Sequence, residues 1–185
     1  MSASLWSATA GTGPDVVLVH GSLDRSAGML KLSRRLDTEW RVTRYDRRGY
    51  GRSVPHAGPY TLDAQISDLV DVIDGLAAPV VLFGHSFGGN VALGVADRHP
   101  ELVRAVAIYE SPLSWTEWWP RDSAGGAAAV VADDPEAAAE AFMRRLIGDG
   151  RWERLPASTR DARRSEGPAM LGELADLRLG APWQP

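Results

Sequence analysis

Short strand-like runs alternate along the first part of the chain with segments in which apolar residues recur at helical spacing. The strand-like runs occupy residues 16–20, 41–45, 80–84 and 103–109, and runs of this length are typical of buried parallel strands. Residues 5–9 precede a Gly-Thr-Gly-Pro turn and predict an additional edge strand. The alternation predicts an α/β fold in three layers, with helices on the faces of a mostly parallel sheet.

Helix signals separate the first 110 residues from the rest. Thr61 is a predicted N-cap, and apolar residues recur behind it at Leu62, Ile66, Leu69, Val70, Ile73 and Leu76. Beyond Tyr109 no strand-like run recurs, whereas Asp134-Pro135 predicts the start of a helix, Gly148 its end, and residues 169–178 a further helix. We therefore expect residues 1–110 to hold the sheet and residues 111–185 to form a helical segment.

The composition argues against several classes of protein. A net charge of -4 gives no sign of the positively charged surface that binds nucleic acid or an anionic membrane. The absence of cysteine excludes disulfides and thiolate metal sites. No apolar stretch reaches the length of about 18 residues that a membrane helix needs, and the first residues lack a signal-sequence pattern. We expect a cytoplasmic protein without a metal or organic cofactor, and the sequence leaves its oligomeric state open.

The candidate chemistry begins at Gly84-His85-Ser86-Phe87-Gly88, which follows the apolar run Val80-Val81-Leu82-Phe83 and opens a helix-compatible segment. The G-x-S-x-G pattern alone is a weak signal, but a strand before it and a helix after it predict a nucleophile elbow. Gly84, Gly88 and Gly89 supply the small neighbours that such a turn needs. The alternative is an anion-binding loop, although the Lys and the spacing of a phosphate-binding loop are absent.

Two further motifs also follow strand-like runs. Val16-Val17-Leu18-Val19 leads into His20-Gly21, and residues 41–45 lead into Asp46-Arg47-Arg48-Gly49-Tyr50-Gly51-Arg52-Ser53. With the HG, D-x-R-G-x-G-x-S and G-H-S-x-G-G motifs in this order, the chain resembles the bacterial α/β-hydrolases that use a serine nucleophile. The resemblance covers residues 5 to 120 well and the rest loosely. It implies that residues 111–185 are a helical cap over the active site.

The resemblance implies a serine hydrolase that acts on a small acyl substrate, with ester hydrolysis as the leading reaction. Related sequences also cleave lactones, amides or carbon-carbon bonds, and some are cofactor-free haloperoxidases. Ser86 would attack the acyl carbonyl, and the backbone N–H groups of Phe87 and Ser22 would hold the oxyanion. We expect Trp115, Trp118, Trp119, Trp152 and Trp183 mainly to pack the cap on the core, with one or two of the first three touching substrate.

The catalytic base is missing from this pattern. Family members place the acid and then the His after the nucleophile, but the only later His is His99, which a helix over residues 87–98 would carry about 20 Å from Ser86. His20 belongs to the oxyanion loop, His56 to a Pro/Gly-rich loop, and His85 to the elbow, where its side chain is expected to point away from the substrate. None of the four is a convincing base.

The acid is equally open. Glu110 ends the strand after the nucleophile strand, where haloalkane dehalogenases carry their acid, but those enzymes use an Asp nucleophile. Most relatives with a serine elbow carry an Asp one strand later. The other interpretation of Glu110 is a partly buried glutamate that is hydrogen-bonded near the pocket.

The economical interpretation is a chain that lacks the strands bearing the acid and the His, with Pro182-Trp183-Gln184-Pro185 approaching the next strand. The strand over residues 103–109 would then have an unpaired edge, which is an aggregation liability. Two alternatives remain. One is a hydrolase-like binding protein that has lost its base, and the other is a fragment completed by a second chain.

Overall fold

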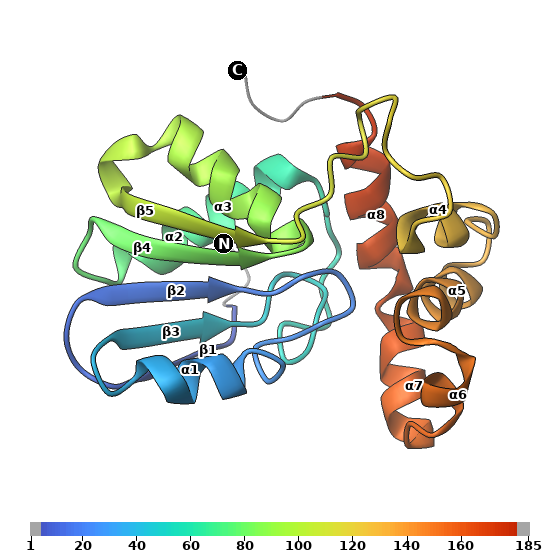
Figure 1. Cartoon of the computed structure of the whole chain (residues 1–185), viewed down its shortest axis with the longest axis horizontal. Helices are drawn as coiled ribbons and strands as arrows, with labels where there is room; N and C mark the ends of the chain where they lie inside the picture. Colours follow the sequence, from blue (N-terminus) through green and yellow to red (C-terminus); the bar gives the residue numbers. More distant parts are fainter. Residues whose placement is uncertain (1–4, 181–185) are drawn as a thin grey trace.

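The computed structural model describes residues 5–180 and contains a five-stranded sheet in the order β1-β3-β2-β4-β5 (Figure 1). The strands are β1 (Ser7–Ala10), β2 (Asp15–Val19), β3 (Arg41–Tyr45), β4 (Val80–His85) and β5 (Val103–Tyr109). Neighbouring strands run parallel except β1, which pairs antiparallel with β3. The five expected strands are present, and the edge strand expected at residues 5–9 begins at Ser7.

The helices of the described chain are α1 (Leu30–Leu36), α2 (Leu62–Asp74), α3 (Phe87–Arg98), the 3₁₀ turn η1 (Pro100–Leu102), α4 (Ala124–Ala129), α5 (Pro135–Ile147), α6 (Asp149–Glu153), α7 (Ala157–Ser165) and α8 (Gly167–Leu177). Both predicted N-caps are confirmed. Thr61 Oγ1 accepts the Ala64 N–H at 3.3 Å, and the Asp134 carboxylate accepts the N–H groups of Glu136 and Ala137.

The sheet lies between two apolar layers, as the alternation predicts. Val17 and Val19 point to the face covered by α2 and α3, and pack with residues such as Leu69. Val16 and Leu18 point to the opposite face and pack with Met29 and residues of α1. Because successive strand residues face opposite sides, the run over β2 is buried on both faces.

Helices α4 to α8 lie beyond the carboxyl ends of the parallel strands (Figure 1). They form a third apolar cluster that includes Leu23 and Tyr50 from loops of the sheet part. Trp152 is fully buried in it, as expected, whereas Trp118 is exposed, so the packing prediction is wrong for Trp118. Trp183 and the expected approach to another strand at residues 182–185 lie outside the described residues. The role of residues 111–185 as a cap stays a prediction.

The D-x-R-G-x-G-x-S motif folds the loop after β3 onto itself. The Asp46 carboxylate accepts the N–H groups of Ser26 at 2.6 Å and Arg52 at 2.9 Å, and the Ser53 hydroxyl donates to the Asp46 carbonyl. Arg48 makes two hydrogen bonds of 2.6 Å to Asp68 on α2. The motif residues Asp46, Arg48 and Ser53 are therefore engaged in holding the scaffold.

His20 joins the end of β2 to the loop after β3. Its Nε2 accepts the Arg47 N–H at 3.0 Å, so Nδ1 carries the proton and donates to the Gly21 carbonyl at 2.8 Å. Burial lowers the pKa of His20 well below its ordinary value, and the positive charge of Arg47 lowers it further. The imidazole is therefore neutral in the folded protein.

Strand β5 is the last strand of the sheet and is seven residues long. Its side chains are poorly covered, and Ile108 and Tyr109 are exposed. On the face that α1 covers at β2 and β3, Val81 and Phe83 of β4 are only partly buried. Within residues 5–180 no strand pairs with the outer edge of β5, which lies next to β4, the strand that leads to Ser86.

Self-association of the chain through this edge is expected, because a long flat strand with apolar side chains offers unpaired backbone groups. Ile108→Lys should shift the chain toward monomer at micromolar concentration in sedimentation velocity. Val130→Lys, a change at another exposed apolar residue, is the matched control and should leave association as it is. A wild-type chain that stays monomeric and unfolds cooperatively would contradict this expectation.

His20 should make folding stability depend on pH. The folded pKa is lowered, so protons favour the unfolded chain once the pH falls below the ordinary His value of about 6.5. Stability is fully present above that pH and declines below it, with a limiting slope of about 1.4 kcal/mol per pH unit from this group. In urea unfolding, His20→Gln should reduce the loss of unfolding free energy as the pH falls. Val130→Gln, at an exposed residue that does not titrate, should leave the slope at the wild-type value.

Candidate active site

Ser86 stands on the turn between β4 and α3, where it is the residue before the first turn of the helix. Its backbone has φ 52° and ψ -128°, which a residue with a side chain rarely adopts. The Ser86 N–H donates to the Tyr109 carbonyl at 2.8 Å, and the Ser86 carbonyl accepts the Gly89 N–H at 2.8 Å. Strand, strained turn and helix follow one another as the motif predicts.

The glycines around Ser86 are required by close backbone contacts. A β-carbon on Gly84 would lie 2.5 Å from the Gly88 carbonyl oxygen, and one on Gly88 would lie 2.3 Å from the Val19 carbonyl oxygen. At Gly89 a β-carbon would collide with the Ser111 hydroxyl at 1.7 Å. The reason given for these glycines from the sequence therefore holds in the structure.

The loop after β2 passes directly beside Ser86. A β-carbon on Gly21 would lie 2.8 Å from the Ser86 β-carbon, so only glycine lets the two segments approach this closely. The next residue, Ser22, lines the same cavity as Ser86 and Phe87. The structure thus brings the nucleophile candidate and both oxyanion candidates together.

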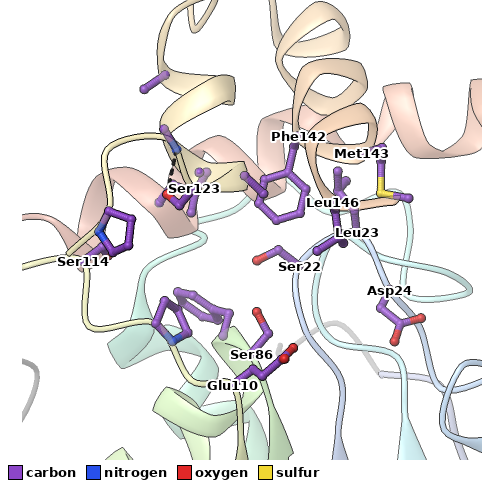
Figure 2. A pocket seen from close by; sticks show the side chains of 18 of the residues that line it. Ser22, Leu23, Asp24, Ser86, Glu110, Ser114, Ser123, Phe142, Met143 and Leu146 are labelled. Carbon is purple, nitrogen blue, oxygen red and sulfur yellow. Dashed lines mark hydrogen bonds between the residues drawn. The ribbon is translucent and has the colours of Figure 1, made fainter. Parts of the chain in front are cut away.

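A cavity of about 970 Å³ opens over Ser86 between the sheet and the helical segment. Figure 2 shows Ser22, Ser86 and Glu110 at its sheet side, with Phe142, Met143 and Leu146 of α5 facing them. Charges of both signs line it as well: Asp24, Glu110, Glu117, Arg121, Arg151, Arg163 and Arg178. Trp119 lines the cavity too, whereas Trp115 and Trp118 are not among its lining residues.

Backbone strain is concentrated at this cavity. Within residues 5–180, the residues other than glycine that have a positive φ are Leu23, Ser86 and Glu110. All three line the cavity (Figure 2). Each costs of order 1–3 kcal/mol, and such residues are typical of active sites.

Glu110 follows β5 with φ 54° and is 65% exposed. The interpretation of Glu110 as a partly buried, hydrogen-bonded glutamate therefore does not fit. Its carboxylate lies 4.0 Å from Nε2 of His85, whose ring stacks on Tyr109. His85 lines the cavity, which differs from the expectation that it points away.

The other histidines are placed as scaffold or surface groups. Both ring nitrogens of His20 are engaged in hydrogen bonds. His56 Nδ1 accepts the Gly58 N–H, and His99 follows the far end of α3, 3.6 Å from Glu101. Neither His56 nor His99 is among the residues lining the cavity.

Buried groups that the sequence pattern did not predict connect the helical segment to the site. Glu173 of α8 is fully buried and accepts a hydrogen bond from the Ser22 hydroxyl at 2.5 Å. It also pairs with buried Arg47. The available signal was a single acid among Met170, Leu174 and Leu177, which mark the buried stripe of the helix.

Glu173 also sets the proton state of its neighbours. Burial raises the pKa of Tyr50 well above its ordinary value, and the Glu173 charge raises it further, so Tyr50 stays a donor. Burial acts to lower the pKa of Arg47, but Glu173 outweighs this and the pKa is raised. Arg47 therefore stays protonated.

Between residues 5 and 180 no group of three or more His, Cys, Asp or Glu side chains could hold a metal ion. None of the helices in that range is long and apolar enough to cross a membrane.

Comparison with known proteins assigns the fold and the family. The model of the "Alpha/beta hydrolase family" matches residues 16–185. A pimeloyl-[acyl-carrier protein] methyl ester esterase of Chromobacterium violaceum is 32% identical over 146 residues, which is 78% of this chain and 56% of that protein. Lipase LipV of Mycobacterium tuberculosis is 38% identical over 101 residues, covering 54% of this chain and 38% of that protein. The chain spans about a quarter to a half of the length of such curated relatives.

Solved structures cover more of the chain. An alpha/beta hydrolase from Sphaerobacter thermophilus matches 98% of it with 26% identity and a TM-score of 0.65, over 72% of that structure. E-2-(acetamidomethylene)succinate hydrolase matches 94% of it with 25% identity and a TM-score of 0.68, over 69% of that structure. With its parallel sheet, its elbow and these similarities, the chain belongs to the alpha/beta hydrolase family.

Proposed function

We propose that the chain is a serine hydrolase of small acyl substrates, with Ser86 as the nucleophile. The observation that carries the proposal is the collection of strained residues at one cavity, with Ser86 on a sharp turn between β4 and α3. A binding protein has no need of a strained serine at that place. Membership of a family whose relatives are named esterases and lipases supports the same reaction class.

The reaction would proceed through an acyl-enzyme. Ser86 Oγ attacks the carbonyl carbon while its proton passes to a base, and the oxyanion that forms accepts the N–H groups of Phe87 and Ser22. The carbon-oxygen bond to the leaving alcohol then breaks, and the alcohol takes the proton. Water attacks the acyl-enzyme by the same steps in reverse order, which releases the acid and restores Ser86.

The base is proposed to come from outside residues 5–180. Of the four histidines, His20 is committed to the scaffold, while His56 and His99 are not among the cavity-lining residues. His85 lines the cavity, but it is the last residue of β4, directly before Ser86, and its Nε2 faces Glu110. Glu110 remains the candidate acid, because it follows β5 directly and lines the cavity.

The helical segment is proposed to act as a cap that selects the acyl group. It supplies the apolar residues Phe142, Met143 and Leu146 opposite Ser86. Burying each additional methylene of a substrate against such side chains contributes up to about 0.8 kcal/mol. An ester with an apolar acyl chain is therefore the best substrate class, and we place the reaction in the cytoplasm.

Free imidazole should activate Ser86 in the 185-residue chain. Added imidazole can serve as the proton acceptor for Ser86, so labelling by a fluorophosphonate should rise with imidazole concentration. Mass spectrometry of peptides would locate the adduct on Ser86, and Ser86→Ala should give none.

The outcomes separate the alternatives. Rapid labelling without imidazole would contradict an external base and point to a base within the chain. No labelling of Ser86 at any imidazole concentration would contradict the nucleophile assignment and favour a binding protein. Labelling that also appears on addition of a second polypeptide would identify that polypeptide as the source of the base.

Leu146 should contribute to acyl-chain preference. Its side chain is exposed within the cavity wall, so substitution removes a contact for ligand at little cost to the core. In a series of alkyl fluorophosphonates with growing chains, wild type should gain up to about fourfold in rate per methylene, and Leu146→Ala should reduce that gain. Val130 is not among the cavity-lining residues, so Val130→Ala should show the same gain in rate per methylene as wild type.

A further inference from the structure

The carboxylate of Glu173 is saturated with hydrogen bonds. Its Oε2 accepts from the Ser22 hydroxyl at 2.5 Å and from the Tyr50 hydroxyl at 2.8 Å. Its Oε1 accepts from Gln65 Nε2 at 2.9 Å and from Arg47 Nη1. Two carboxylate oxygens offer about four acceptor positions, and all four are used.

The four donors come from three separate segments of the sheet part. Ser22 lies in the loop after β2, Arg47 and Tyr50 lie in the loop after β3, and Gln65 lies on α2. Glu173 itself belongs to the helical segment, more than 100 residues away from each of the four donors. One side chain of α8 therefore ties the helical segment to the loops after β2 and β3 and to α2.

Ser22 is the donor that matters for chemistry. Gly21, the residue before Ser22, lies so close to Ser86 that an added β-carbon would be 2.8 Å from the Ser86 β-carbon. Leu23, the residue after Ser22, has a positive φ of 53°. A loop with a strained residue keeps its conformation only where its surroundings hold it. The hydrogen bond from the Ser22 hydroxyl to Glu173 is such a restraint, and it acts on the residue whose N–H is the oxyanion donor.

We propose that Glu173 is a positioning residue for the oxyanion hole: it holds Ser22, and with it the Ser22 N–H, at the place where negative charge develops on the substrate. The inference rests on the proposed function of Ser86. It makes the helical segment part of the catalytic machinery as well as a wall of the cavity. The effect runs through the backbone of Ser22, without contact between Glu173 and the substrate.

Glu166 supplies a matched control. It precedes α8, is also a buried carboxylate, and also binds the sheet part, through Arg25 at 2.5 Å and the Gly51 N–H at 2.9 Å. None of its hydrogen bonds in the described chain involves Ser22. Replacement of Glu166 therefore weakens the attachment of the helical segment while leaving the Ser22 tether in place.

The first experiment measures imidazole-dependent phosphonylation of Ser86 at saturating and limiting probe. Glu173→Gln should lower the maximal rate about 10- to 100-fold, with the half-saturating probe concentration within about threefold of wild type, because a misplaced oxyanion donor acts on the transition state. Glu166→Gln should keep the maximal rate within about threefold. Equal losses in the two variants would overturn the proposal, since general loosening would then explain both.

A double-mutant cycle tests the route through Ser22. Ser22→Ala removes the hydroxyl but keeps the backbone N–H, so it should reproduce the rate loss while retaining the Arg47 and Gln65 bonds that hold Glu173 in place. Adding Glu173→Gln to Ser22→Ala should cost at most about threefold more, because in this proposal both changes act on the rate through the same hydroxyl–carboxylate hydrogen bond. Full additivity of the two losses would overturn the proposal.

Hydrogen exchange separates this inference from the proposed function. Amides of residues 21–23, resolved with overlapping peptides, should exchange faster in Glu173→Gln and Ser22→Ala than in Glu166→Gln, whose hydrogen bond to the same loop is made by Arg25. Unchanged exchange in Ser22→Ala would overturn the tether even if Glu173→Gln fails to fold. If wild-type Ser86 is never labelled while exchange changes as expected, the hydrolase assignment fails and the tether stands as a restraint on the loop alone.

Discussion

The buried ion pair of Glu173 and Arg47 is the interaction on which the arrangement of the site depends. Removing two charges from water is costly, and such a pair is tolerated only where further hydrogen bonds satisfy its remaining atoms. Ser22, Tyr50 and Gln65 supply those bonds to Glu173. Loss of one charge would leave the other buried and unpaired, at a cost of about 3–5 kcal/mol. The pair therefore couples the position of helix α8 to the positions of the loops after β2 and β3.

The polar residues near the cavity divide into those that hold the scaffold and those that are kept under strain. Asp46, Arg48 and His20 have their bonding groups engaged by neighbouring backbone or side chains. Ser86 and Glu110, in contrast, combine a strained backbone with access to the cavity. The satisfied groups hold the framework rigid, and that rigidity allows backbone strain to persist at Ser86 and Glu110.

Sequence reasoning succeeded where local rules decide the structure. The strands, the long helices α2, α3 and α5 and the elbow follow from periodicity, caps and glycines, all of which are readable within a few residues. The short helices α1, α4, α6 and α7 offered too few turns for a periodic signal. The Glu173–Arg47 pair spans 126 residues, and the exposure of Glu110 depends on what covers β5, so neither could be obtained from local pattern.

The outer edge of β5 and the cavity over Ser86 belong to the same region of the molecule. Parallel pairing places Tyr109 of β5 opposite His85 of β4, so the carboxyl end of β5 lies beside Ser86. A strand added in parallel to β5 would end at that same level, because parallel strands bring their carboxyl ends to one edge of a sheet. The loop after such a strand would reach the cavity next to Glu110. A segment that pairs with β5 would thus cover its exposed edge and bring new side chains to Ser86 in one step.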